Sequence, residues 1–184
     1  VTTFSGLYRY DMNDVVEVVG RFHTAPILRF LYKGKGITNI ASEKLSEQQL
    51  IEAVQRGAKR IGVDHDFFFG YADAERGGYA LFIDIAQGDR PRAEDLAAAV
   101  DEALGEVNVE YASKRESERL RPLVVVPLRR NAFSAYREIR LAEGAPEGQL
   151  KWMNLSASDE NLSRMRRLVA PDARTDLPKR YLEQ

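Results

Sequence analysis

The sequence has no cysteine, few histidines and no long apolar stretch. Without cysteine, disulfide bonds and thiolate chemistry are excluded. The histidines, His23 and His65, have no partner at metal-ligand spacing, so we expect no metal site in this chain. No apolar run approaches the ~18 residues that span a bilayer, and the start of the chain has no signal-peptide pattern. These absences predict a cytoplasmic protein.

An excess of charge of one sign is also missing. The sequence has 27 Lys and Arg against 28 Asp and Glu, for a net charge of −1. Such a balance gives no overall field to recruit nucleic acid or an anionic membrane, and we expect neither as a partner. The run Phe67-Phe68-Phe69 has no basic pattern beside it, so we interpret it as sheet core and not as a base-stacking surface.

The length of 184 residues suits one domain, or one domain with a small flanking piece. The chain begins at Val1 and not at Met, which suggests a piece of a longer polypeptide.

The first part of the chain has a strand pattern around a polar turn. We predict paired strands at 6–10 and 14–21 and a third strand from 27 to 32. Asp14 lies at the far edge of the turn, where its carboxylate can project from a rigid sheet toward a ligand. Alternatively, Asp11 and Asp14 only bond their own backbone, as in Asx turns, and the spacing does not decide between the two.

From residue 37 onward the pattern changes to alternating strands and helices. A strand is expected at 37–41, followed by a helix that Ser46 caps and Gln49 completes as a capping box. Strands at 67–71 and 79–85 are joined by a glycine-containing hairpin turn. The remaining expected elements are a helix opened by Pro91, a charged helix within 108–119, a strand from Pro122 to Pro127, a helix capped by Asn131 and a tail helix at 159–168. The order predicts an α+β fold with a ferredoxin-like βαββαβ domain and added helices.

Several motifs occur in a recognisable order. They are Gly6-Leu7-Tyr8-Arg9-Tyr10 with Asp14-Val15-Val16, then Ala25-Pro26-Ile27-Leu28-Arg29-Phe30, Ser42-Glu43-Lys44 and Gly148-Gln149-Leu150-Lys151. In order and spacing the sequence resembles the carboxyl-terminal third of the Gretchen Hagen family of acyl-acid amido synthetases, which belong to the adenylate-forming superfamily. The resemblance implies an ATP-dependent ligase that adenylates a small carboxylic acid and conjugates the acyl group to an amino acid.

The resemblance also implies roles for individual residues. Lys151 would be the catalytic lysine of adenylation, and Asp14 would bind the ribose of ATP. Tyr8 and Arg9, from the same motif as Asp14, would lie near the nucleotide. Lys44 matches a family lysine near the nucleotide, and the equal alternative is a solvated surface lysine at the entry of a helix. The sequence departs from the family where Trp152-Met153 replaces a Pro-Arg pair, where Asn13 replaces a glycine and where Asp11 replaces a basic residue.

The same resemblance predicts the domain organisation. Residues 1–35 would be the β-strand end of a large amino-terminal domain with a hinge near Lys33–Gly36, and residues 36–184 would be a mobile carboxyl-terminal domain. ATP and Mg²⁺ are the expected cofactors, with magnesium ligands outside this chain. The expected partners are the acid, the amino acid and the rest of the same polypeptide, so this chain alone should be inactive. The sequence does not identify the acid or the amino acid.

A different class of function stays open at this point. A stand-alone ferredoxin-like module that binds a small molecule or a protein, without catalysis, has the same strand order. That alternative leaves the motif within 6–18 unexplained, because this segment precedes the βαββαβ pattern.

Overall fold

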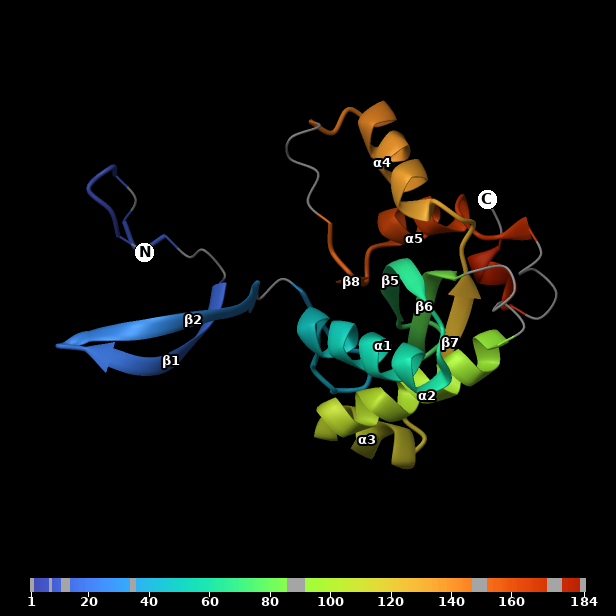
Figure 1. Cartoon of the computed structure of the whole chain (residues 1–184), viewed down its shortest axis with the longest axis horizontal. Helices are drawn as coiled ribbons and strands as arrows, with labels where there is room; N and C mark the ends of the chain where they lie inside the picture. The colour runs from blue at the N-terminus through green and yellow to red at the C-terminus, as the bar shows by residue number, and fades with distance from the viewer. Residues whose placement is uncertain are drawn as a thin grey trace.

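A computed structural model describes residues 2–6, 8–10, 14–33, 36–85, 92–146, 152–171 and 177–182. It shows a long β-hairpin beside an α+β body (Figure 1). No helix in these ranges is long and apolar enough to cross a membrane.

The hairpin consists of β1 (Asp14–Phe22) and β2 (Ala25–Lys33). The strands are antiparallel, with Phe22 opposite Ala25 and Asp14 opposite Lys33. His23 in the turn has a φ of 52°, the left-handed conformation that tight hairpin turns require. The predicted pairing of 6–10 with 14–21 is therefore wrong. Residues 8–10 form no strand, and the third predicted strand is the true partner of the second.

The body is built on a four-stranded sheet in the order β7-β6-β5-β8. A hairpin of β5 (His65–Asp73) and β6 (Gly78–Ile85) forms its centre, in agreement with the sequence prediction. The outer strands β7 (Arg121–Pro127) and β8 (Leu155–Ser156) run parallel to β6 and β5 respectively.

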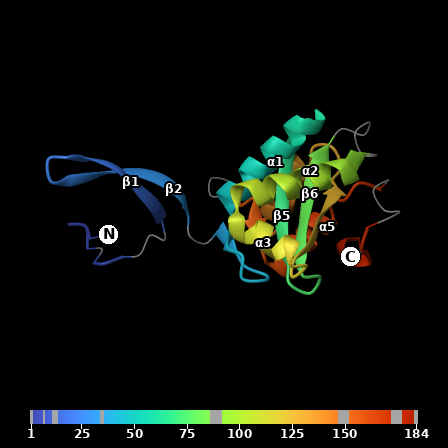
Figure 2. The same ribbon diagram turned by 90° about the horizontal axis from the view of Figure 1, so that it is seen from below.

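Helices cover both faces of this sheet. On one face lie α1 (Glu47–Ile61), α2 (Ala93–Val107) and α3 (Val109–Glu116). On the other lie α4 (Ala132–Ala142), α5 (Asp159–Arg166) and the short η5 (Lys179–Tyr181) (Figures 1 and 2). Because both faces are covered, successive residues of β5 and β6 are buried alternately in two cores, which explains their continuous apolar runs.

The α+β class is confirmed, but the strand expected at 37–41 does not join the main sheet. It is reduced to β3 (Ile37–Thr38), which pairs only with β4 (Leu45–Ser46). The edge position next to β5 belongs instead to β8, from the far end of the chain. The described strands therefore do not have the expected ferredoxin-like order.

The starts of two helices show which of the predicted N-caps are present in the structure. The Ser46 side chain accepts from the Gln49 N–H, and the Gln49 side chain accepts from the Ser46 N–H, so the predicted capping box is present. Asn131 also precedes its helix, but it adopts a φ of 59° and its side chain makes no capping bond. Instead, Asp84 Oδ2 accepts from the Ala132 N–H at 3.2 Å, and burial raises the pKa of this carboxyl. The cap of α4 thus comes from β6.

Candidate functional site

Lys44 lies in a loop whose backbone is hydrogen-bonded to a buried carboxylate. Glu43 is fully buried, and its two oxygens accept from the N–H groups of Ile40 and Ala41 at 2.9 and 2.7 Å. Its Oε1 also accepts from the Tyr79 hydroxyl on β6. Burial is the main cause that raises the pKa of Tyr79, and this hydrogen bond is the second. The phenol therefore stays protonated and can donate. The loop is fixed to the sheet core by Glu43.

The backbone of Lys44 is fixed as well. Its N–H donates to Glu110 Oε2 at 3.1 Å, and its carbonyl accepts from Asn108 Nδ2 at 3.0 Å. Both partners come from the start of α3. The Lys44 side chain is exposed, so it is a cation on a rigid support and is accessible to a ligand.

The residues predicted to bind the nucleotide from the amino-terminal segment lie elsewhere. Tyr8 is 79% exposed, and Arg9 is exposed with a φ of 49° and an N–H that donates to Thr2 Oγ1 at 3.1 Å. Asp14 begins β1 opposite Lys33, at the end of the hairpin that leads toward the body. In Figures 1 and 2 the amino-terminal segment lies apart from the body, so this conformation does not bring Tyr8 and Arg9 to Lys44.

Lys151 itself lies outside the described residues, but the residues that follow it are anchored. The Trp152 ring packs on Phe67 and Tyr136, with centroids 4.3 and 4.8 Å apart, and its Nε1 donates to Asn154 Oδ1 at 2.5 Å. Asn154 donates from its backbone N–H and its Nδ2 to Glu47 Oε1, in the first turn of α1. The chain immediately after Lys151 is therefore joined to both helical layers.

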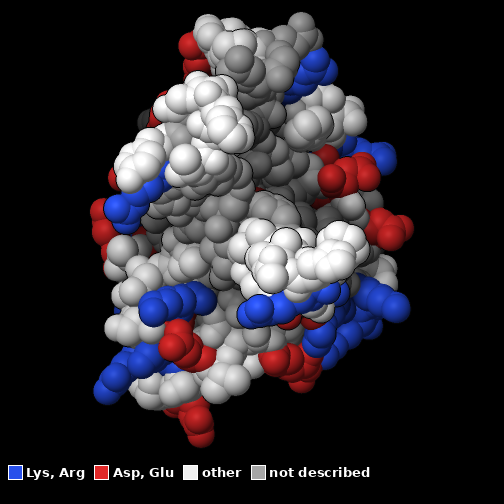
Figure 3. Space-filling model, turned by 90° about the vertical axis from the view of Figure 1, so that its left-hand side faces the viewer, with Lys and Arg blue, Asp and Glu red and all other residues white. Residues whose placement is uncertain are grey.

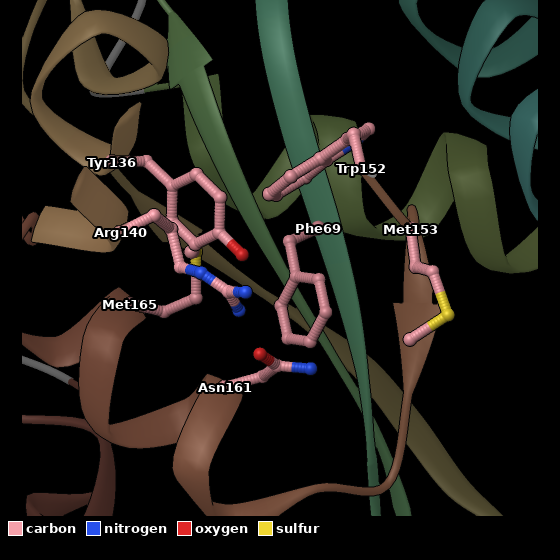
Figure 4. A pocket seen from close by; sticks show the side chains of 7 residues that line it. All are labelled: Phe69, Tyr136, Arg140, Trp152, Met153, Asn161 and Met165. Atoms are coloured by element: carbon pink, nitrogen blue, oxygen red, sulfur yellow. The ribbon is translucent and has the colours of Figure 1, made fainter. Parts of the chain in front are cut away.

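A cavity of about 50 Å³ lies beside this anchor (Figure 4). It is lined by Phe69 of β5, Tyr136 and Arg140 of α4, Trp152, Met153, and Asn161 and Met165 of α5. Sequence reasoning missed it. The only local signals are the four-residue spacings within α4 and α5, and these acquire meaning only when the two helices are packed together.

On the face that Figure 3 shows, the described residues carry charges of both signs. In Figure 3 the described Lys and Arg side chains alternate with Asp and Glu around uncharged areas. This distribution agrees with the net charge of −1.

Two family models match the chain consecutively. The GH3 family central domain matches residues 1–33, and the GH3 family C-terminal domain matches residues 48–160. The second match covers more than half of the chain. The chain belongs to the GH3 family.

Individual proteins agree with this result. The probable indole-3-acetic acid-amido synthetase GH3.11 of Oryza sativa subsp. japonica is 32% identical over 166 residues, which cover 82% of this chain and 27% of that protein. The 4-substituted benzoates-glutamate ligase GH3.12 of Arabidopsis thaliana is 29% identical over 167 residues, with 82% and 29% covered. The chain thus spans less than a third of the length of these relatives.

The fold agrees with that of a solved relative. The structure of GH3.15 acyl acid amido synthetase superposes with a TM-score of 0.75 at 24% identity, over 92% of this chain and 33% of that one. The same protein in complex with 2,4-DB gives a TM-score of 0.73. The resemblance inferred from the motifs is confirmed.

Proposed function

We propose that this chain is the carboxyl-terminal part of an ATP-dependent acyl-acid amido synthetase. In this proposal residues 1–35 complete a large amino-terminal domain, Lys33–Gly36 is the hinge, and residues 36–184 form a mobile domain that carries Lys151. The observation that carries the proposal is the order of the two family matches, the central domain at 1–33 and the C-terminal domain at 48–160. A stand-alone module would not need the first of these matches.

The hairpin supports the presence of further chain around it. Two-stranded hairpins are at best marginally stable alone in water. Here both strands expose large apolar side chains, namely Val16, Val18, Val19, Phe22, Ile27 and Leu28. Exposed apolar groups of this extent indicate a surface that another part of the protein covers. In this proposal, the amino-terminal part of the family's proteins would supply such a cover.

The proposed reaction has two steps. In the first, an oxygen of the substrate carboxylate attacks the α-phosphorus of ATP, the bond to the β-phosphate oxygen breaks, and pyrophosphate leaves. Negative charge grows on the α-phosphate oxygens, and the ammonium of Lys151 would stabilise it. In the second, the amine of an amino acid attacks the acyl carbonyl, loses a proton, and AMP leaves.

The nucleotide would be held by residues on both sides of the hinge. The carboxylate of Asp14 can accept hydrogen bonds from the vicinal ribose hydroxyls, with Tyr8 and Arg9 nearby in sequence. Lys44 would approach from the rigid loop above α1. Because the present conformation keeps the segment with Tyr8 and Arg9 apart from the body, the proposal includes rotation at Lys33–Gly36, where glycines can absorb large φ and ψ changes.

Magnesium has no ligand set in the described part of the chain. No group of three His, Cys, Asp or Glu side chains there could hold a metal ion. The ion would therefore enter with ATP.

The class of substrate that we propose is based on the names of the relatives. Their acids are indole-3-acetic acid and 4-substituted benzoates, and the acceptor named for one of them is glutamate. We accordingly propose an aromatic carboxylic acid and an amino acid as substrates, in the cytoplasm.

Acid-dependent exchange of pyrophosphate into ATP tests the proposal. The native-length protein, as its source cells make it, is assayed with a panel of indole, benzoic and phenoxy acids. We expect Lys151→Ala and Asp14→Asn each to lower exchange by about 100-fold, the scale for loss of one electrostatic stabiliser. Lys59→Ala, on the exposed side of α1, is the matched control. Unchanged exchange in folded Lys151→Ala or Asp14→Asn protein would remove that residue from the mechanism.

A further inference from the structure

The cavity beside Trp152 combines an apolar wall with a cation and polar donors. Phe69, Trp152, Met153 and Met165 supply the apolar wall. Figure 4 shows the Tyr136 hydroxyl and the Arg140 guanidinium on the same side of Phe69, with the Asn161 amide below the ring and its oxygen on the side of Arg140. Such a combination is typical of a small-molecule site, in which a few convergent polar groups fix the ligand within apolar walls.

Arg140 is half-buried, and one of its donors is unused. Its Nε is buried and has no hydrogen-bond partner, although its charge interacts with that of Glu143 on the same helix. Two other arginines also have a buried, unpartnered Nε, but neither lines this cavity. Buried polar groups are nearly always paired in native proteins, so an unpartnered arginine Nε beside a cavity points to a ligand site.

The nearby carboxylates are already neutralised by another residue. Glu143, three residues beyond Arg140 on α4, accepts from Arg164, whose Nη2 lies 2.7 Å from its Oε2. Arg164 also binds Glu160 on its own helix. The hydrogen bond to Arg164 lowers the pKa of Glu143, so this pair stays charged at neutral pH. Arg140 also interacts with the charge of Glu143, and it is the cation among the seven residues that line the cavity.

Asn161 adds a donor. Its Oδ1 accepts from Arg164 Nη1 at 2.9 Å, which orients the amide, and its Nδ2 lies 3.4 Å from Ser156 Oγ. One Nδ2 hydrogen is thus left to donate, and the guanidinium of Arg140 is also a donor only. A ligand group that accepts from both and carries negative charge is a carboxylate.

Size narrows the ligand further. A cavity needs roughly 10–15 Å³ per water-sized group, so about 50 Å³ holds only a few non-hydrogen atoms. That is a carboxylate with one or two carbons, and any longer part of the ligand must extend out of the cavity. The seven lining residues include no Asp or Glu, so an ammonium beside the carboxylate would have no partner.

We propose that this cavity, with Arg140 as its anchor, binds the carboxylate end of a small acid on an apolar stem that has no amino group next to the carboxylate. The ligand could be a free short-chain acid or the end of a longer acid. The proposal does not rest on the adenylation proposal, because binding can be measured without ATP.

The test follows the indole resonance of Trp152 in ¹⁵N–¹H spectra of the native-length protein, with Trp152→Phe identifying the signal. Propionate is the probe, and hexanoate represents the end of a longer acid. A contact of this size should bind in the millimolar range, so titration extends to about 100 mM at constant ionic strength. We expect propionate to shift the signal saturably, and tighter binding of hexanoate would identify the longer acid as the source.

Matched ligands and variants decide whether the site recognises a carboxylate. Propionamide has the shape without the charge, and glycine adds an adjacent ammonium; both should bind about tenfold more weakly or not at all. Arg140→Gln should weaken propionate about tenfold, whereas Arg137→Gln, one turn away on α4 and exposed, should leave it unchanged. No saturable shift, equal binding of propionamide or glycine, or full binding by Arg140→Gln would overturn the proposal. The ligand comparison holds even if the variant fails to fold.

Discussion

The carboxylate of Glu43 accepts a hydrogen bond from the hydroxyl of Tyr79, and both residues are almost completely buried. The same carboxylate holds two backbone N–H groups of the loop that leads to Lys44. The buried carboxylate of Glu43 therefore attaches the segment that follows the hairpin to the central strand β6. If Lys44 acts as proposed, this contact would serve the reaction only through the position of Lys44.

Replacing either member of this pair should destabilise the loop. Tyr79→Phe leaves Glu43 with one donor fewer, and Glu43→Gln weakens the hold on Ile40 and Ala41. Losing a partner of a buried polar group costs about 1–3 kcal/mol. Hydrogen exchange of residues 38–46 should become faster in both variants. Tyr8→Phe, on a 79% exposed side chain, is the control and should change nothing. Unaltered exchange in Tyr79→Phe would show that Glu43 holds the loop without it.

Gly57 is a second position where the structure predicts a specific cost. It lies in α1 where the helix crosses α2, and a Cβ there would meet Val100 Cγ2 at 2.7 Å and the Val100 backbone nitrogen at 2.9 Å. Alanine is the better helix former by about 1 kcal/mol, but overpacking of a core costs about 1–3 kcal/mol. Because one clash is with backbone, we expect Gly57→Ala to destabilise the protein in urea unfolding.

Gly105 provides the matched comparison within the neighbouring helix. A Cβ at Gly105 would lie 3.6 Å from Ala112 Cβ, which is an ordinary contact. Gly105→Ala should therefore gain the helix preference without the clash and stabilise the protein by up to about 1 kcal/mol. If both alanine variants shifted the urea midpoint in the same direction, close packing at Gly57 would not be the deciding effect.

Alkaline pH should unfold the body through its buried tyrosines. Burial raises the pKa of Tyr79, Tyr111 and Tyr181, and each phenol also donates to a carboxylate. The neutral form is favoured in the folded state, so stability is unaffected below the unfolded pKa of about 10. Above it, the unfolded chain loses protons that the fold retains, and stability falls by about 1.4 kcal/mol per pH unit for each tyrosine.

Two measurements check this pH dependence. The free energy of unfolding should be flat from neutral pH to the onset of tyrosine ionisation and then decline steeply. Phenolate absorbance from these tyrosines should appear together with unfolding and not before it. Phenolate formation in a protein that stays folded would contradict the burial argument.

The sequence predicted best what depends on neighbouring residues. The capping box of Ser46 and Gln49 and the β5–β6 hairpin needed only local chemistry, and both are present. The pairing of β1 with β2 was assigned to the wrong neighbour, because apolar strands on either side of 14–21 carry the same pattern. β8 has only two residues, too few for any periodicity, and its place at the sheet edge depends on tertiary packing.

For the candidate sites too, the sequence indicated what lies within one motif and missed what depends on tertiary packing. The Ser42-Glu43-Lys44 motif indicated Lys44, but not that Glu43 is the buried support. The cavity at Arg140 was missed because its walls come from β5, α4, α5 and the segment before β8. Residues separated by this much sequence share no local pattern. Only the closed three-layer packing brings them together.

Trp152 should matter to catalysis because it fixes the chain next to Lys151. Its ring lies against Phe67 and Tyr136, and Asn154, to which it donates, is bound to Glu47 of α1. If Lys151 acts as proposed, Trp152→Ala should lower the rate constant kcat of acid-dependent adenylation by about 10–100-fold, since small displacements of a catalytic group have effects of this size. Binding of ATP should change less, because the ring does not belong to the proposed nucleotide site.

The conservative variant separates positioning from general loss of structure. Trp152→Phe keeps an aromatic ring on Phe67 but loses the Nε1 donor, so it should recover most of kcat. Hydrogen exchange of residues 152–156 should rise in Trp152→Ala and much less in Trp152→Phe. If Trp152→Ala kept its full kcat while exchange in this segment increased, the anchor would support only the fold. If kcat and exchange change together, the replacement of the family's Pro-Arg pair by Trp152-Met153 is an alternative way to hold the same lysine.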